Sequence, residues 1–209
     1  MGGTGRCLTR ARTRGSYTPS MFEAFWISTG IVALAEMGDK TQLLSLVLAA
    51  RFKRPWPIVW GILAATLVNH ALAGAVGGWL TTVMGPQALR WVLGASFIAM
   101  AVWMLIPDKL DDTGADKPPR FGVFGTTLVA FFIAEMGDKT QIATVMLAAK
   151  YQAVAAVVAG TTLGMMLANA PVVWLGERIT RKVPIRAVHL VSAAIFLVLG
   201  LLAIFSSAA

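Results

Sequence analysis

The sequence predicts an all-α membrane protein with six transmembrane helices, arranged as two three-helix repeats that have opposite orientations in the membrane. Three observations support this prediction. Of the 209 residues, 57% are hydrophobic and only 13% are charged, against about 25% charged residues in soluble domains. Six apolar stretches are each long enough for the roughly 20 helical residues that cross a bilayer. One eight-residue segment also occurs twice, once in each half of the chain.

The duplicated segment is Ala-Glu-Met-Gly-Asp-Lys-Thr-Gln at residues 35–42, and it recurs unchanged 99 positions later at residues 134–141. Eight identical residues in so short a chain indicate an internal duplication. Each copy contains three apolar stretches, which is an odd number. The second copy must therefore enter the membrane in the opposite direction to the first. Inverted repeats of this kind place the substrate site of a transporter near the middle of the bilayer.

The elements follow in chain order. Residues 1–20 form a basic tail that we expect to be disordered, because it has no apolar periodicity, and we expect Met21 to be the true start of the chain. Repeat 1 comprises residues 21–107, a linker residues 108–120, and repeat 2 residues 121–209. The predicted membrane helices lie at residues 22–50, 56–83, 89–106, 121–149, 152–175 and 187–205. They are separated by a basic turn at residues 51–55, the Gly85-Pro86 break, the polar linker, and a basic loop at residues 177–186.

The lysines and arginines between the predicted helices set the orientation. The loops after the first, third and fifth helices contain three, three and four basic residues, whereas the other two connections have one each: Arg90 just inside the third helix, and Lys150 after the fourth. Cytoplasmic loops carry the excess of basic residues. The linker is therefore predicted to be cytoplasmic and both termini to face outside. The net charge of +8 is interpreted in the same way, as contact with lipid headgroups and not with nucleic acid.

Each motif places two carboxylates, a glycine and a lysine inside apolar sequence. Glu36 and Asp39 are three residues apart and would share one face of a continuous helix, as would Glu135 and Asp138. Gly38 permits a helix break, which would free carbonyl oxygens at the same depth. A charged side chain at mid-membrane costs about 2.5–3.5 kcal/mol, so six unpaired ones would cost roughly 18 kcal/mol. These groups must therefore meet each other or a ligand.

Ion pairing within each motif is one way to meet this cost. Lys40 and Lys139 follow Glu36 and Glu135 by four residues, a spacing that predicts ion pairs along a helix and a purely structural role. Four carboxylates against two lysines nevertheless leave a charge of −2 between the repeats, which a divalent cation would neutralise. Carboxylates inside a membrane are functional by default, so we favour an ion site in which the lysines balance charge. The predicted ligands are Glu36, Asp39, Glu135 and Asp138.

The neighbouring residue types narrow the choice of ion. The hydroxyls of Thr41 and Thr140 and the amides of Gln42 and Gln141 would add further oxygen ligands. An all-oxygen site suits Ca²⁺, Mn²⁺ or Mg²⁺ and disfavours Zn²⁺ and Cu⁺.

Four polar residues in the other predicted helices say less about the ion site. Asn69 and Asn169 lie at similar positions in the second and fifth helices. They would either orient the carboxylates or form interhelical hydrogen bonds. His70 and His189 are isolated, and we interpret them as packing or hydrogen-bonding residues.

The duplicated motif resembles the E-x-G-D-[KR]-[TS] signature of the GDT family, which comprises Golgi manganese/calcium transporters and bacterial manganese exporters of the LysE-like superfamily. The resemblance covers residues 21–206. It implies a cation/proton exchanger that moves Mn²⁺, and in some members Ca²⁺, out of the cytoplasm. It also implies that the metal is a substrate, with no cofactor and no catalytic residues. The short chain resembles the bacterial members, which implies an inner-membrane location.

The carboxylate motif has three candidate functions: a cation exchanger, a membrane-embedded metalloenzyme and a passive channel. No Ser/His or HExxH constellation accompanies the carboxylates, which disfavours a membrane-embedded metalloenzyme. A duplicated site at mid-membrane fits a rocking exchanger better than a passive channel. A Ca²⁺/H⁺ antiporter with Mn²⁺ as its secondary substrate is the alternative among exchangers. Export of a divalent cation against the membrane potential needs a driving force, and crowded carboxylates that exchange metal for protons would supply it.

Overall fold

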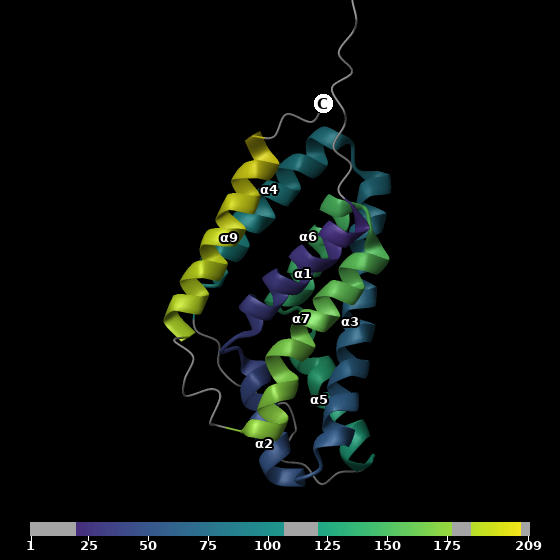
Figure 1. Ribbon diagram of the computed structural model, residues 1–209. Helices are drawn as coiled ribbons and strands as arrows, with labels where there is room; N and C mark the ends of the chain where they lie inside the picture. Colours follow the sequence, from purple (N-terminus) through teal and green to yellow (C-terminus); the bar gives the residue numbers. More distant parts are fainter. Residues whose placement is uncertain (1–19, 107–120, 177–184, 206–209) are drawn as a thin grey trace, which may run out of the picture.

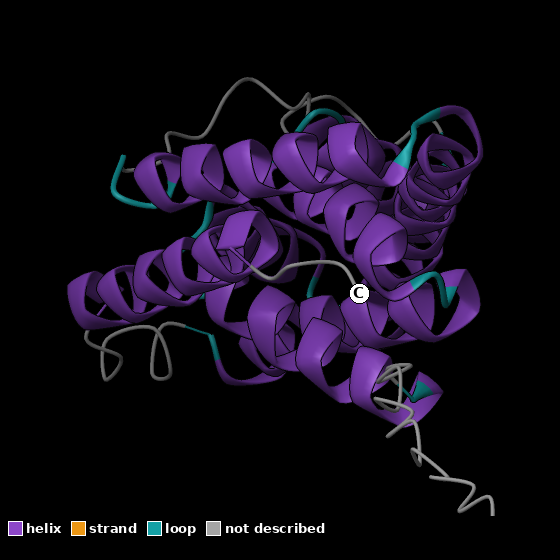
Figure 2. Ribbon diagram, turned by 90° about the horizontal axis from the view of Figure 1, so that it is seen from above, coloured by secondary structure: helices purple, strands orange, loops and turns teal. Residues whose placement is uncertain are grey.

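The computed structural model describes residues 20–106, 121–176 and 185–205, and the regular structure within these residues is entirely helical (Figure 2). The all-α prediction is confirmed. The predicted tail before residue 20, the linker at residues 108–120 and most of the basic loop at residues 177–186 lie outside the described residues. The described helices are α1 (Met21–Glu36), α2 (Lys40–Phe52), α3 (Pro55–Val83), α4 (Pro86–Trp103), α5 (Gly122–Glu135), α6 (Lys139–Tyr151), α7 (Val154–Leu175) and α9 (Ile185–Phe205) (Figure 1).

Two of the predicted membrane helices are broken at the duplicated motif. The stretch predicted at residues 22–50 consists of α1 and α2, whose axes differ in direction by 71°. The stretch predicted at residues 121–149 is likewise divided into α5 and α6. Figure 1 shows α1 and α6 in the upper half of the bundle and α2 and α5 in the lower half. Both breaks therefore lie near mid-height.

Three of the described helices, α3, α7 and α9, are long and apolar enough to cross a membrane alone. The bent pair α1–α2 adds a fourth span if it is counted as one. Helix α5 is apolar but has only 14 residues. A multi-pass membrane protein follows from these helices, whereas six spans remain a prediction that also needs α4 and the α5–α6 pair to cross.

The duplication extends to backbone conformation. The residues that precede α2 and α6, Asp39 and Asp138, have φ/ψ of −77°/166° and −77°/169°. The residues that end these helices, Lys53 and Gln152, both adopt the left-handed conformation, with φ/ψ of 52°/28° and 52°/24°. Helices α3 and α7 then begin at positions that are again 99 residues apart. The two halves therefore keep one register from the motif into the next helix.

Helix α3 of the first half packs on α5 of the second half, and the two helices run parallel. Gly61 lies against the backbone carbonyl of Phe124, where an added Cβ would be 2.9 Å from the oxygen. Eight residues later in both helices, the Asn69 side chain donates a hydrogen bond to the carbonyl of Phe132 (3.1 Å). Residue numbers rise together along this contact, which defines its parallel sense.

Helix α7 of the second half packs on α1 of the first half in the same way. Gly160 lies against the carbonyl of Phe25, and Gly164 lies against the carbonyl of Thr29. Gly160 and Phe25 are the counterparts, 99 residues apart, of Gly61 and Phe124. The contact is therefore reciprocal, because each half contributes its broken helix to the other half's long helix.

Helices α4 and α9 form the third contact between the halves and run antiparallel. Gly94 lies against the Ile204 side chain, and Gly200 lies against Ile98. Figure 1 shows the two helices side by side along one flank of the bundle. The principal packing of the described helices is thus between the two halves and not within either half.

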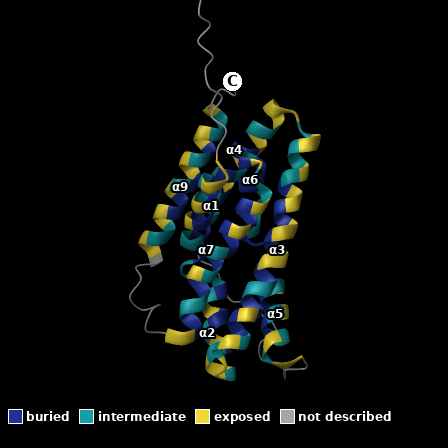
Figure 3. Cartoon of the chain, turned by 45° about the vertical axis from the view of Figure 1, so that its right-hand side comes forward, coloured by how far each residue is buried: buried dark blue, intermediate teal, exposed yellow. Residues whose placement is uncertain are grey.

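The distribution of polar and apolar groups is that of a protein surrounded by lipid. Large apolar side chains are exposed along the outer faces of the helices, with Trp79 60% exposed as an example. Charged side chains are buried inside, including Glu36, Glu135 and Lys139. Figure 3 shows the exposed residues on the outside and the buried ones facing the interior of the bundle. Buried charge in such a bundle marks a functional site by default.

Candidate metal centre

A glycine turn in each motif separates the two carboxylates. Gly38 has φ of +82° and Gly137 has φ of +78°, a backbone region that residues with a side chain rarely adopt. The Gly38 N–H donates a hydrogen bond to Gln42 Oε1 (2.9 Å), and the Gly137 N–H donates one to Gln141 Oε1 (2.7 Å). Each glutamine caps the start of the following helix, much as the last residue of a capping box does.

The predicted helix break at the motif is confirmed, whereas the predicted common helical face is wrong. Glu36 is the last residue of α1, and Asp39 is the N-cap of α2. The chain turns between them, so spacing along a continuous helix does not decide where the carboxylates point. Helices α5 and α6 separate Glu135 from Asp138 in the same way.

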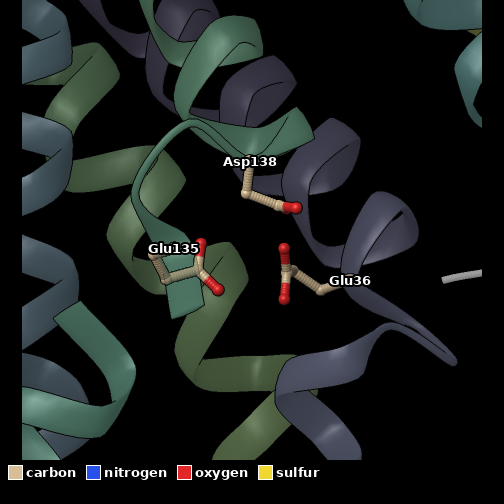
Figure 4. A group of neighbouring side chains, drawn as sticks. All are labelled: Glu36, Glu135 and Asp138. Atoms are coloured by element: carbon tan, nitrogen blue, oxygen red, sulfur yellow. The ribbon is translucent and has the colours of Figure 1, made fainter. Parts of the chain in front are cut away.

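The carboxylates gather across the two halves of the chain. One oxygen from each of Glu36, Glu135 and Asp138 lies within 4.8 Å of the others (Figure 4). Oxygens on opposite sides of a bound Ca²⁺ are about 5 Å apart, because each ligand lies 2.3–2.6 Å from the ion. The three groups are therefore close enough to share one ion. Asp39, the fourth predicted ligand, is also buried beside the cluster, where one of its oxygens faces Lys139.

The two lysines pair with aspartates of the opposite motif. Lys40 Nζ lies 2.8 Å from Asp138 Oδ1, and Lys139 Nζ lies 3.4 Å from Asp39 Oδ1. The predicted pairing of Lys40 with Glu36 is wrong because the helix is interrupted between them, and Lys139, predicted to pair with Glu135, pairs with Asp39. The observed pairs are reciprocal, so each half neutralises one carboxylate of the other.

Hydroxyl groups hold the two glutamates. Thr41 Oγ1 donates a hydrogen bond to Glu36 Oε2 (2.6 Å), and Thr140 Oγ1 donates one to Glu135 Oε2 (2.9 Å). These threonines, predicted as metal ligands, contact the carboxylates directly and fix one oxygen of each. The glutamine amides, also predicted as ligands, each accept a hydrogen bond from a glycine turn, and Gln42 Nε2 donates one to the Ala168 carbonyl (3.0 Å).

The two asparagines have different surroundings. Asn169 Nδ2 lies 3.5 Å from Glu36 Oε2, and Asn169 Oδ1 accepts a hydrogen bond from Ser45 (3.1 Å). Asn69 instead donates to the Phe132 carbonyl. Asn169 thus lies at a carboxylate, where it could orient that group, and Asn69 forms an interhelical hydrogen bond between α3 and α5.

Three carboxylate oxygens in the cluster are buried without a hydrogen-bond partner among the described residues. They are Glu36 Oε1, Glu135 Oε1 and Asp138 Oδ2, one from each member of the group in Figure 4. A buried charge without a partner is strongly unfavourable. Since four carboxylates face two lysines, the cluster lacks two positive charges, and a hard divalent cation bound by oxygen would supply them.

Two further polar residues lie near the motif, and Ser45 was not predicted from the sequence. Ser45 is buried and donates to Asn169. His189 of α9, interpreted as a packing or hydrogen-bonding residue, lies with Nε2 3.2 Å from the Met37 carbonyl in the first glycine turn. The position of Ser45 one helical turn after Thr41 was the available signal for its role.

Comparison with known proteins gives a family. A family model described as "Divalent cation/proton antiporter GDT1" matches residues 24–112 and again residues 123–209. A Vibrio cholerae protein named "Putative manganese exporter" is 49% identical over 90% of this chain and 94% of its own length. A GDT1-like protein of Synechocystis is 28% identical over 84% of this chain and 94% of its own. The Saccharomyces cerevisiae divalent cation/proton antiporter is 21% identical over 92% of this chain and 87% of its own. No solved structure matches.

Proposed function

Because the chain belongs to the GDT1 family of divalent cation/proton antiporters, and is thus a transporter and not an enzyme, we propose that it exports Mn²⁺ from the cytoplasm in exchange for protons. The observation that carries the proposal is the trio of partnerless, buried carboxylate oxygens of Glu36, Glu135 and Asp138. The trio contains only hard oxygen donors, which suit Mn²⁺ and Ca²⁺. The name of the Vibrio cholerae relative favours Mn²⁺ as the principal substrate, with Ca²⁺ as the alternative.

Charge balance provides the coupling between metal and protons. The four carboxylates and two lysines carry −2 together, and either one divalent cation or two protons cancel this charge. Both loaded forms are then neutral, whereas the empty, ionised form would carry −2 through a low-dielectric bundle at a high cost. A site that changes its access only when neutral must return protons for each metal released, which is obligatory exchange.

The proposed architecture is a pair of inverted repeats that cross the membrane six times. In such an arrangement the first and fifth spans run in the same direction, as do the second and fourth, while the third and sixth run oppositely. The parallel contacts of α1 with α7 and α3 with α5, and the antiparallel contact of α4 with α9, support it. Broken helices that meet at mid-height, as in Figure 1, are typical of transporter sites between such repeats.

The orientation we propose places the 108–120 linker in the cytoplasm and both termini outside a bacterial inner membrane, as the distribution of basic residues favours. Single cysteines in a Cys7→Ser background test it. T113C in the linker should be protected from an impermeant thiol reagent added to intact cells, and S207C near the carboxyl end should react. Labelling of T113C but not of S207C would reverse the orientation.

Transport by purified protein in proteoliposomes tests the function. We expect an imposed proton gradient to drive Mn²⁺ uphill, toward the side from which protons leave, and a protonophore to abolish the accumulation. Mn²⁺, Ca²⁺ and Mg²⁺ tested separately rank the substrates. Downhill flux that ignores the proton gradient would indicate a channel and contradict the exchanger. Ca²⁺ transported in clear preference to Mn²⁺ would overturn the choice of metal while leaving exchange intact.

A further inference from the structure

His70 is a buried side chain that none of the contacts described above explains. It lies on α3 and has no exposed surface. Neither of its ring nitrogens has a hydrogen-bond partner among the described residues. Leaving two polar atoms unpaired in a protein interior is unfavourable, so such a residue needs a reason to be there.

The repeat register gives His70 a counterpart. Helices α3 and α7 begin 99 residues apart, and Gly61 and Gly160, also 99 apart, lie against equivalent carbonyls of the partner half. With this spacing of 99 residues, His70 in the first half corresponds to Asn169 in the second. Asn69, which the sequence had paired with Asn169, corresponds instead to Ala168.

The surroundings of Asn169 indicate what His70 faces. Asn169 approaches Glu36, the last residue of α1, and accepts a hydrogen bond from Ser45 of α2. The equivalents of these two residues in the other half are Glu135 and Thr144. The hydrogen bond from Asn69 to the Phe132 carbonyl places His70 and Glu135 at similar heights along the bundle. His70 is the next residue along α3, and Glu135 lies within one helical turn of Phe132.

The two halves, although identical in motif sequence, are not in the same state. Lys40 is 2.8 Å from its aspartate and 18% exposed, whereas Lys139 is 3.4 Å from its own and 1% exposed. The turn of the first motif is contacted by His189, whereas Met136 in the second turn is 58% exposed. A contact formed in one half can therefore be open in the other.

We propose that His70 is a positioning residue that donates a ring N–H to the Glu135 carboxylate during transport, as Asn169 does for Glu36. This inference rests on the proposed function, since it assigns His70 to the same cation site. A neutral imidazole always carries one N–H, so the donor is present in either tautomer. The contact is open in the state seen here, where Glu135 Oε1 and both His70 nitrogens are partnerless, and it forms when the second half takes the arrangement now held by the first.

Substitution of His70 separates this role from mere packing. H70L removes the donor without leaving a large void, and H70N introduces the donor that the other half uses. We expect H70L to lower Mn²⁺ transport in proteoliposomes by about 10- to 100-fold, the usual effect of losing a residue that orients a metal ligand. Its thermal stability should be unchanged or higher, because no unpaired nitrogen stays buried. H70N should keep transport close to that of the wild type, and N169L, the matched control, should lose it as H70L does.

Each outcome decides the inference. Transport lost in H70L, retained in H70N, and accompanied by undiminished stability supports it. Wild-type transport by H70L overturns the inference. A loss of transport in both H70L and H70N that parallels a loss of stability also overturns it. H70Q against H70M makes the same comparison if H70L does not insert, since glutamine has an N–H donor and methionine has none. Wild-type protein that transports no Mn²⁺ refutes the proposed function itself, a result distinguishable from all of these.

Discussion

Neutralising any one of Glu36, Glu135 and Asp138 with its isosteric amide is expected to reduce divalent cation transport by more than about 100-fold. Loss of a group that only orients a metal ligand already costs 10- to 100-fold, and these residues are the proposed ligands themselves. Each change also removes one of the two negative charges that the cation is needed to cancel. The variants are E36Q, E135Q and D138N, assayed for Mn²⁺ flux in proteoliposomes.

The same variants should remain folded. The three carboxylates lie within 4.8 Å of one another and are buried, so removing one charge relieves repulsion and desolvation in the metal-free protein. Thermal stability without metal should therefore be unchanged or increased in E36Q and E135Q. It should be lower in D138N, because that change leaves Lys40 without the aspartate it pairs with. A cation present at 100 times its Kd should stabilise the wild type by about 2.7 kcal/mol, and this stabilisation should vanish in the variants.

A carboxylate outside the cluster provides the control for these variants. Glu23 lies in the first turn of α1, the helix that ends at Glu36. E23Q should keep wild-type transport and wild-type stabilisation by metal. Wild-type transport by two or more of the three cluster variants would show that the carboxylates are not the ion site.

Metal affinity is expected to fall steeply as the pH falls. Protons and metal compete for the same carboxylates, so metal binds to the ionised site and expels protons from the protonated one. If two protons leave for each metal, the apparent Kd rises by up to about 100-fold for each unit that the pH falls through the range where the site is protonated. Above that range the affinity should level off. Metal titrations from about pH 8 to about pH 5 span ordinary and perturbed carboxylate pKa values.

Exchange for protons also determines whether the membrane potential opposes metal export. Moving a divalent cation out of a cell against 100 mV costs about 4.6 kcal/mol, at about 2.3 kcal/mol for each elementary charge. Exchange for two protons moves no net charge and removes that cost. The pH gradient then drives the cycle alone, which is what the neutral metal-bound and doubly protonated forms of the cluster permit.

The duplicated motif made much of the site predictable. Intramembrane carboxylates had to meet a partner, and the glycine between Glu36 and Asp39 marked a break in the helix. Both expectations agree with the structure, in which Gly38 has positive φ and the carboxylates gather between the halves. Charge counting also gave the deficit of two positive charges before any geometry was known.

The partners of individual side chains were not predictable, because spacing rules assume a continuous helix. Lys40 would reach Glu36 along such a helix, but the turn at Gly38 directs it to Asp138 of the other half. Gln42 offers a carbonyl oxygen to a metal, and in the structure that oxygen accepts a hydrogen bond from the Gly38 N–H that the same turn exposes. Tertiary contact between the halves decides these pairings, and sequence separation says nothing about it.

The 99-residue spacing of the two halves also indicates which polar residues are equivalent, and residue type alone indicates the wrong pair. Asn69 and Asn169 look alike by residue type, but the 99-residue register pairs Asn169 with His70. The hydrogen bonds agree with the register, since Asn169 approaches Glu36 while Asn69 binds the Phe132 carbonyl. In a duplicated chain, register is a better guide to equivalent roles than residue type.

The number of protons released when Mn²⁺ binds to the purified protein tests the central claim most directly. Binding calorimetry in buffers of different ionisation enthalpy measures it without any need for transport. We expect close to two protons per Mn²⁺ at a pH where the site is protonated, a smaller number as the pH rises, and no metal-linked release from E36Q, E135Q or D138N. Tight Mn²⁺ binding without proton release at any pH between about 5 and 8 would contradict exchange at this carboxylate cluster.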